Sequence, residues 1–140
     1  MTQATEIVNA MLAKLRGVAA FETPEQVCDA DPQLDEYTIL PIAHLREIRE
    51  SNIERRAGGW KRSRVLQLDL YQPAEDGRAG RDALLDAVLE QVSPIGNGIP
   101  FPGTKLIKLT IGEITLEPEE IAASVLLTQI PITIEYLASN

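Results

Sequence analysis

The sequence has 140 residues, of which 44% are hydrophobic, and this size and composition predict one soluble domain with its own core. It carries 13 basic and 21 acidic residues for a net charge of −8, which argues against binding of nucleic acid over the whole surface, because phosphate needs an excess of lysine and arginine. A single cysteine, Cys28, excludes an intramolecular disulfide and any zinc site built from several cysteines.

The N-terminal stretch does not have the pattern of a secretory signal, and no apolar run reaches the roughly 20 residues of a membrane helix. We therefore expect an intracellular protein that makes no contact with a membrane.

Apolar residues recur at helical spacing from Ile7 to Val18, which predicts an amphipathic helix over 3–18, with Thr2 or Thr5 as its cap. The acidic residues 21–37 are expected to be mostly loop, with a short helical turn or strand around Glu25–Cys28.

The middle of the chain predicts two strands joined by a charged arm. Residues 37–42 are apolar and partly β-branched, which is typical of a strand, with Pro41 at an edge or bulge. Residues 44–57 fit either a solvated ribbon or a short helix, and Gly58-Gly59 favours a tight turn. The return strand alternates apolar and polar residues around Leu68 and stops at Pro73.

The second half begins with a turn-rich loop, 74–80, and a helix over 81–93. A loop rich in glycine and proline, 93–103, leads to a strand at 105–111, for which one face is expected to hold Ile107, Leu109 and Ile111. After an acidic turn region, 112–120, a long strand at 124–136 is expected to point Ile130, Ile132, Ile134 and Tyr136 inward. Pro131 lies on its outward face, which again indicates an edge or a bulge.

This order of elements predicts an α+β protein in which a four-stranded, mostly antiparallel sheet is packed by two helices and carries a protruding β-hairpin. We expect one domain over 1–140, with the hairpin arm at about 44–66.

The arm, residues 44–66, is named here the basic arm because it holds seven of the 13 basic residues against three glutamates. Its charge is therefore 7 − 3 = +4, and the rest of the chain carries −8 − 4 = −12. Arginine binds carboxylate and phosphate through two parallel hydrogen bonds, and an exposed tryptophan is a frequent interface anchor. The predicted protein-interface residues are Arg46, Arg49, Arg55, Arg56, Trp60, Lys61, Arg62 and Arg64. The alternative is a solvated hairpin with no partner.

Other candidate chemistry is weak, so no catalytic residue, cofactor or metal is expected. Residues 98–105 resemble a phosphate-binding loop, but their two prolines remove backbone donors and a strand follows where a helix is required. Cys28 and His44 would need to meet, with a third residue to orient the ring, before they could form a hydrolase site. A cation could bind to the acidic side chains of Asp29, Asp31, Asp35 and Glu36. This segment lacks the glycine that a calcium-binding loop requires, so it does not match that motif. A small nucleic-acid-binding module using the basic arm remains a second functional class, opposed by the charge of −12 elsewhere.

The pattern formed by residues 37–45, the polar hairpin, 60–76, the helix around 83–92 and 123–136 resembles the lambda-type tail terminator family of long-tailed phages, whose members include minor tail protein U. The resemblance covers about 100 of the 140 residues. It implies a small α+β virion protein of the phage tail and neck, assembled in the host cytoplasm. Such a protein forms a hexameric ring that caps the tail tube, stops its polymerisation and offers the head-tail joining surface.

The partners that the resemblance implies are further copies of the chain, the tail tube protein and a head-completion or neck protein. DNA would pass through the lumen without specific binding, and six copies would carry 6 × −8 = −48. A basic arm that meets an acidic body makes a heterologous contact, which can close into a ring. Another neck protein, such as a head-completion protein or a stopper, is the alternative within the same class.

Overall fold

The structure, a computed structural model, describes residues 2–30, 32, 34, 38–57, 59–92, 104–116 and 125–138. It is a mixed α+β fold with two helices and one six-stranded sheet, so the expectation of four strands was wrong. The two additional strands, at Val27–Cys28 and Thr115–Leu116, are only two residues long, which is too short to show a periodic pattern. The elements are α1 (Gln3–Arg16), η1 (Pro24–Gln26), β1 (Val27–Cys28), β2 (Ile42–Arg56), β3 (Gly59–Pro73), η2 (Ala74–Asp76), α2 (Gly77–Val92), β4 (Leu106–Ile111), β5 (Thr115–Leu116) and β6 (Val125–Ala138).

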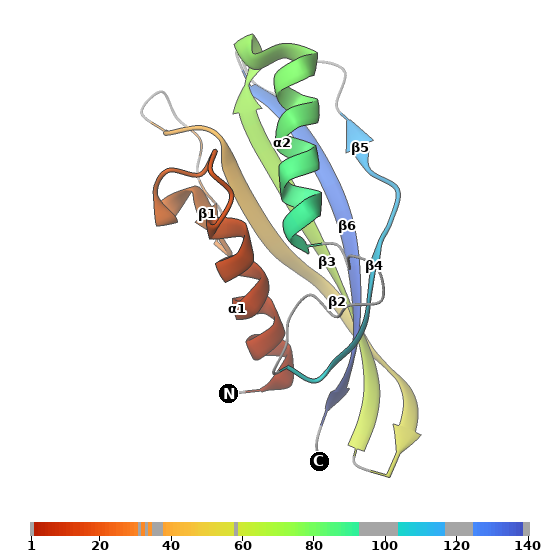
Figure 1. The fold of residues 1–140 in the computed structure, drawn as a ribbon. Coiled ribbons are helices and arrows are strands. Elements are labelled where there is room, and N and C mark those ends of the chain that lie inside the picture. Colours follow the sequence, from red (N-terminus) through yellow and green to blue (C-terminus); the bar gives the residue numbers. More distant parts are fainter. Residues whose placement is uncertain are drawn as a thin grey trace.

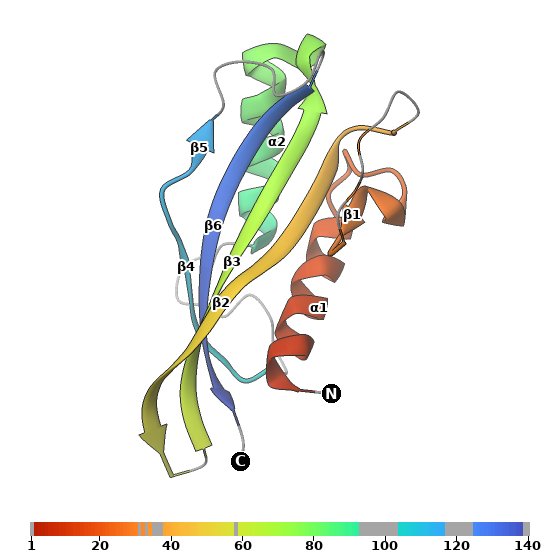
Figure 2. The same ribbon diagram turned by 180° about the vertical axis from the view of Figure 1, so that it is seen from behind.

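Both helices cover the same face of the sheet, and the opposite face is uncovered by them, as Figures 1 and 2 show from the two sides. The sheet has the strand order β1-β2-β3-β6-β4, with β5 also paired to β6. All pairs are antiparallel except β1 with β2. The mostly antiparallel arrangement is as expected.

Helix α1 ends two residues earlier than expected, at Arg16, and is followed by Gly17 as its C-cap. Its N-cap is Thr2, whose hydroxyl oxygen accepts a hydrogen bond from the backbone N–H of Thr5 at 3.2 Å. A short helical turn or a strand was expected around Glu25–Cys28, and the structure has both, η1 and β1.

Helix α2 begins at Gly77, four residues before the expected start, so residues 77–80 are helical and not loop. The two glycines that made this stretch resemble a loop have specific reasons to be there. Gly77 has a φ of 64°, which an L side chain rarely adopts. At Gly80 an added Cβ would lie 2.7 Å from the Cβ of Asp76, so the helix start can pack against η2 only without a side chain.

The predicted strand at 37–42 was wrong, because β2 begins only at Ile42. Residues 38–41 belong to no strand, and Tyr37 lies outside the described residues. Pro41 lacks the N–H that a ladder requires. Its carbonyl oxygen accepts a hydrogen bond from Gln26 Nε2 at 3.0 Å, so this backbone is held by a side chain and not by a strand.

The core lies between the helices and the inward residues of β3 and β6, and the four predicted inward residues of β6 are all buried. These side chains alternate along the strands and repeat at helical spacing along α1 and α2. The principal contributors are Ile7, Met11, Leu15, Leu66, Leu68, Leu70, Leu84, Val88, Val92, Ile130, Ile132, Ile134 and Tyr136.

Strand β4 differs from the expected pattern because a β-bulge shifts its register between Leu106 and Lys108. Leu106 and Leu109 are buried, whereas Ile107 is 43% exposed, so its predicted inward position was wrong.

Pro131 lies in β6, which as a whole is an interior strand. Locally, however, its carbonyl accepts a hydrogen bond from the backbone N–H of Gly112 at 2.8 Å, in the gap between β4 and β5. The missing N–H of Pro131 therefore faces a break in the neighbouring strands.

Candidate functional site

The basic arm is formed by the distal halves of β2 and β3, which pair as far as Arg56 and Gly59. The alternative of a helix at 44–57 was wrong. Figure 1 shows that this end of the two strands extends beyond both helices. The arm is not an isolated two-stranded ribbon, however, because β6 accompanies β3 along its whole length and pairs Ala138 with Trp60. The third strand stiffens the arm, since a lone hairpin is marginally stable in water.

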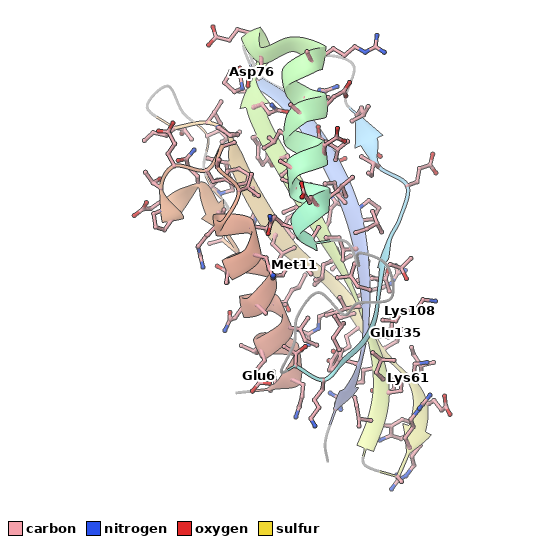
Figure 3. All side chains as sticks on the ribbon, viewed as in Figure 1. Glu6, Met11, Lys61, Asp76, Lys108 and Glu135 are labelled. Carbon is pink, nitrogen blue, oxygen red and sulfur yellow. The ribbon has the colours of Figure 1, made fainter. Side chains whose placement is uncertain are left out.

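Most of the positive charge of the basic arm is balanced by carboxylates of the same chain. Five of its seven basic residues form ion pairs, and each partner lies on β2, β3 or β6. The pairs are Arg46–Asp69, Arg56–Glu54, Lys61–Glu135, Arg62–Glu50, Arg64–Glu47 and Arg64–Glu50. Nζ of Lys61 lies 4.0 Å from Oε2 of Glu135. Both residues are labelled in Figure 3. Counting Asp69 and Glu135 with the three glutamates of the arm, the local charge is 7 − 5 = +2.

Asp69 is the most buried charged group of this region, with 3% of its surface exposed although it lies on the face that no helix covers. The Nε of Arg46 lies 2.9 Å from Oδ2 of Asp69, without the angle of a hydrogen bond. The side-chain amides of Gln67 and Gln129 donate to Oδ1 at 2.9 and 3.4 Å. The carboxylate thus joins β2, β3 and β6, and its oxygens are already engaged.

A second polar cluster lies on the helix-facing side, where the hydrophobic core gives way to the arm. We call Glu47, Glu50, Arg62, Arg64 and Tyr136 the Glu50 cluster. The hydroxyl of Tyr136 donates a hydrogen bond to Glu50. Arg64 donates to Glu50 through Nε at 3.1 Å and also pairs with Glu47. Tyr136, at the end of the inward-facing row of β6, is therefore linked to β2 by hydrogen bonds that involve charged groups.

The Glu50 cluster shifts the pKa of three groups. Burial disfavours the charged form of Glu50, but hydrogen bonds from Tyr136 and Arg64 and the positive charge of Arg64 outweigh it and lower the pKa of this carboxyl. Burial raises the pKa of Tyr136, and the hydrogen bond to Glu50 raises it further. For Arg64, burial is outweighed by the hydrogen bond to Glu47, so its pKa is raised and the guanidinium stays charged.

The two remaining basic residues of the arm differ from the other five. Arg55 stacks over Trp60, with its guanidinium carbon 5.8 Å from the ring centroid. Arg49 is exposed and forms no ion pair or hydrogen bond with any residue that the structure describes. Among the predicted interface residues, Arg49 is therefore the one whose charge is available without breaking an existing contact.

Sequence reasoning missed two apolar residues of the arm. The register of β2 against β3 shifts between Glu47 and Arg49 and again between Asn52 and Glu54. Ile48 and Ile53 are the extra residues of these two β-bulges, and both are 47% exposed. Ile107 occupies the corresponding position in the bulge of β4. A register shift depends on the partner strand, so no periodicity of β2 alone could have identified these residues.

The structure brings Cys28 and His44 together more closely than the sequence indicated. They are register partners in β1 and β2, and His44 is in turn the partner of Asp69 in β3. This row has the residue types of a nucleophile, a base and an orienting acid. Asp69, however, already contacts Arg46 and two glutamines, and His44 is buried. The row therefore places these three residue types side by side in register, and the carboxylate of Asp69 also contacts Arg46, Gln67 and Gln129.

The remaining sequence candidates lie partly outside the described residues. This applies to Asp31, Asp35 and Glu36 of the acidic segment and to residues 98–103 of the loop that resembles a phosphate-binding site. Within the described ranges, no group of three histidine, cysteine or acidic residues is arranged to hold a metal ion. No helix in the same ranges is long and apolar enough to cross a membrane.

Comparisons with known proteins give one kind of match. No protein-family model matches the sequence. No curated protein matches it either. Among solved structures, the fold is similar to a chain of the "Virion of native gene transfer agent (GTA) particle", with a TM-score of 0.56 and 17% sequence identity. The similarity covers 94% of this chain and 93% of the other, so the two share the same fold over nearly their whole lengths.

Proposed function

We propose that this chain is a structural virion protein that acts as a tail terminator: a ring of six copies that caps the tail tube, stops its polymerisation and presents the head-tail joining surface. The observation that carries this proposal is the fold shared, from end to end, with a chain of a gene transfer agent virion particle. The resemblance of the element pattern to the lambda-type tail terminators supplies the finer role. The partners are further copies, the tail tube protein and a head-completion protein, and the location is the tail and neck of the virion.

The basic arm is the part that we assign to the interface. It extends beyond the helices, and its Arg56–Glu54 pair has side chains that are 48% and 56% exposed. Such surface pairs typically contribute only about 0–1 kcal/mol and can exchange partners. The arm residues Arg46, Arg49, Arg55, Arg56, Trp60, Lys61, Arg62 and Arg64 are the proposed contact set. With a local charge of +2 against −10 elsewhere, the arm of one copy is attracted to the body of another.

We further propose that the protein is not an enzyme. The fold shared with a chain of a virion particle favours a structural role over a hydrolase site at Cys28 and His44. The charge of −10 outside the arm opposes a nucleic-acid-binding module, because binding phosphate requires an excess of lysine and arginine. DNA that moves through a ring of this charge would slide without specific binding.

The experiment that tests the role is a tube-growth assay with purified tail tube protein. Adding the chain at a small fraction of the tube protein concentration is expected to cap the ends and stop elongation, with rings visible at the tips by negative-stain microscopy. Tubes that grow to the same length with and without the chain would rule out a terminator. Binding to portal-bearing heads in place of tubes would assign the chain to another component of the neck.

A further inference from the structure

A small apolar hollow lies at the end of the molecule where α2 begins. Its volume is about 260 Å³, and it is lined by residues 18–20 after α1, by Pro41, and by Ala83 and Ala87 of α2. Asp76 is the one charged residue of the lining. Asp76 is exposed, accepts a hydrogen bond from Nε2 of Gln72 at 3.4 Å and forms no ion pair with another described residue. Gln72 also lines the hollow, which therefore offers mostly apolar walls next to a carboxylate that has no ion-pair partner in the described part of the chain.

The size of the hollow indicates what it can receive. Sites for drug-sized molecules typically measure about 300–1,000 Å³, so this hollow lies just below their lower limit. It has room for an aliphatic side chain inserted from a protein surface. The carboxylate beside the walls would then face a cation that accompanies the side chain.

The chain carries such a pair at Ile48 and Arg49. Ile48 is 47% exposed in its β-bulge, and the exposed Arg49 follows it directly without an ion-pair partner in the described part of the chain. Because β1 pairs only with Ala43 and His44, the outer edge of β2 at this point has no neighbouring strand among the described residues. The bulge and the charges oppose pairing with a further strand, so this edge is suited to contacts by side chains.

The pair cannot reach the hollow of its own chain. Pro41 lines the hollow, and Ile48 lies seven residues farther along β2, roughly 20 Å away in an extended strand. The strand runs from the α2 end of the molecule, where Figure 3 places Asp76, toward the arm that carries Lys61. A contact between the two features therefore joins two molecules.

We propose that the hollow receives Ile48 of a second copy of this chain, with Arg49 of that copy paired to Asp76. This inference rests on the proposed function and names the contact that closes its ring. The contact is heterologous, because Ile48 and the hollow belong to different surfaces of one chain. Repetition of such a contact gives a ring when the rotation closes. Arg49 and Asp76 each lack another ion-pair partner in the described structure, so their pairing breaks no existing salt bridge.

The test is sedimentation velocity of the full chain over a range of concentrations, alone and with tail tube protein. Ile48→Ser removes the inserted aliphatic side chain, and Ala83→Phe fills the hollow. Each is expected to raise the concentration needed for assembly about tenfold or more, the usual effect of losing one buried aliphatic side chain. Ile107→Ser is the matched control, because Ile107 is also a bulged isoleucine, with 43% exposure, on the opposite edge of the sheet. Its assembly is expected to equal that of the wild type.

A charge exchange adds a second arm to the experiment. Arg49→Asp and Asp76→Arg are each expected to weaken assembly, and the double variant is expected to restore it. Unchanged thermal unfolding of each variant shows that the fold is retained. If the wild type assembles and either Ile48→Ser or Ala83→Phe assembles equally well, the proposed contact is wrong while the ring stands. If Ala83→Phe instead leaves rings intact but prevents tube binding, the occupant is the tube protein. A wild type that never assembles overturns the proposed function itself.

Discussion

At the residue scale, the distinguishing feature of the molecule is the internal pairing of its basic side chains. The sequence predicted a concentration of arginine, and this concentration is present in the arm. Asp69 pairs with Arg46 and Glu135 pairs with Lys61, in each case from the neighbouring strand. The strand pairing places each carboxylate diagonally across from its basic partner, two positions from the residue directly opposite. Sequence spacing cannot show such partners, which is why the predicted charge of +4 overstates the local charge of +2.

The ion pair at Asp69 gives a first prediction. Arg46→Met keeps the aliphatic stem but leaves a nearly buried carboxylate with two glutamine donors. Because the Arg46 side chain is 41% exposed and partly screened by water, we expect a loss of about 1–2 kcal/mol in the free energy of unfolding, less than for a fully buried pair. Urea denaturation measures this loss.

Arg49→Met is the matched control for that variant, since it removes the same charge from the same strand where no ion pair exists within the described structure. Its expected change in the free energy of unfolding is below about 0.5 kcal/mol. Equal losses in the two variants would show that Asp69 does not depend on Arg46.

The Glu50 cluster gives a prediction with a definite pH dependence. Tyr136→Phe removes the hydroxyl that donates to Glu50 and should lower the free energy of unfolding by about 1–2 kcal/mol near pH 7. The folded-state pKa of Glu50 is below its ordinary value of 4.5, so the contribution is present above pH 4.5 and is lost as the pH falls through the lowered value. The pKa of Tyr136 is raised above 10.0, so its contribution is complete below pH 10 and is lost as the pH rises through the raised value.

The difference in free energy of unfolding between the wild type and Tyr136→Phe should therefore be largest between pH 4.5 and pH 10. It should become smaller below and above this range. Urea denaturation at a series of pH values measures it. Glu50→Gln serves as the control, because it removes the titrating carboxylate and should abolish the narrowing at low pH. A difference that stays constant from pH 3 to pH 7 would contradict the assigned hydrogen bond.

At the element scale, the start of α2 shows how packing can override a propensity. In an ordinary helix, Gly→Ala adds up to about 1 kcal/mol of stability. At Gly80 the new Cβ would lie 2.7 Å from the Cβ of Asp76, so we expect Gly80→Ala to lose about 1 kcal/mol or more, measured by thermal or urea unfolding. Asp76→Gly removes the opposing Cβ, and the double variant should recover most of the loss. A stabilised Gly80→Ala would contradict this packing of η2 against α2.

The elements also show how far the sequence could predict the fold. Periodicity was sufficient for both helices and for the inward faces of β3 and β6, because long amphipathic segments repeat the same signal many times. It failed at Ile107, where one bulge in β4 reverses the alternation, and at residues 77–80, where glycines that suggested a loop are required by close packing. The two-residue strands β1 and β5 are too short to have a period.

The candidate site was predictable only in part for the same reason. The basic residues of the arm are visible in the sequence as a charge run, and their placement at the end of β2 and β3 follows from the hairpin turn. The bulged Ile48, the availability of Arg49 and the hollow beside Asp76 depend on register and on helix packing across the chain. Such features combine residues distant in sequence, and spacing does not encode them.

At the scale of the whole molecule, the features point to assembly by unlike surfaces. The helices cover one face of the sheet and the arm extends from one end (Figure 1). Asp76, which lines the hollow, lies at the other end (Figure 3). Copies that each carry −8 repel one another at long range. Local contacts between apolar side chains and between opposite charges must outweigh this repulsion. A ring places those contacts around a closed circle and leaves no unused pair of surfaces.

The measurement that tests the central claim most directly is the mass of the purified chain in solution, alone and in the presence of the tail tube protein. We predict a closed species of six times the monomer mass, formed by the chain alone or on the ends of tubes. A chain that remains at the monomer mass in both conditions, at every concentration tested, would contradict the account.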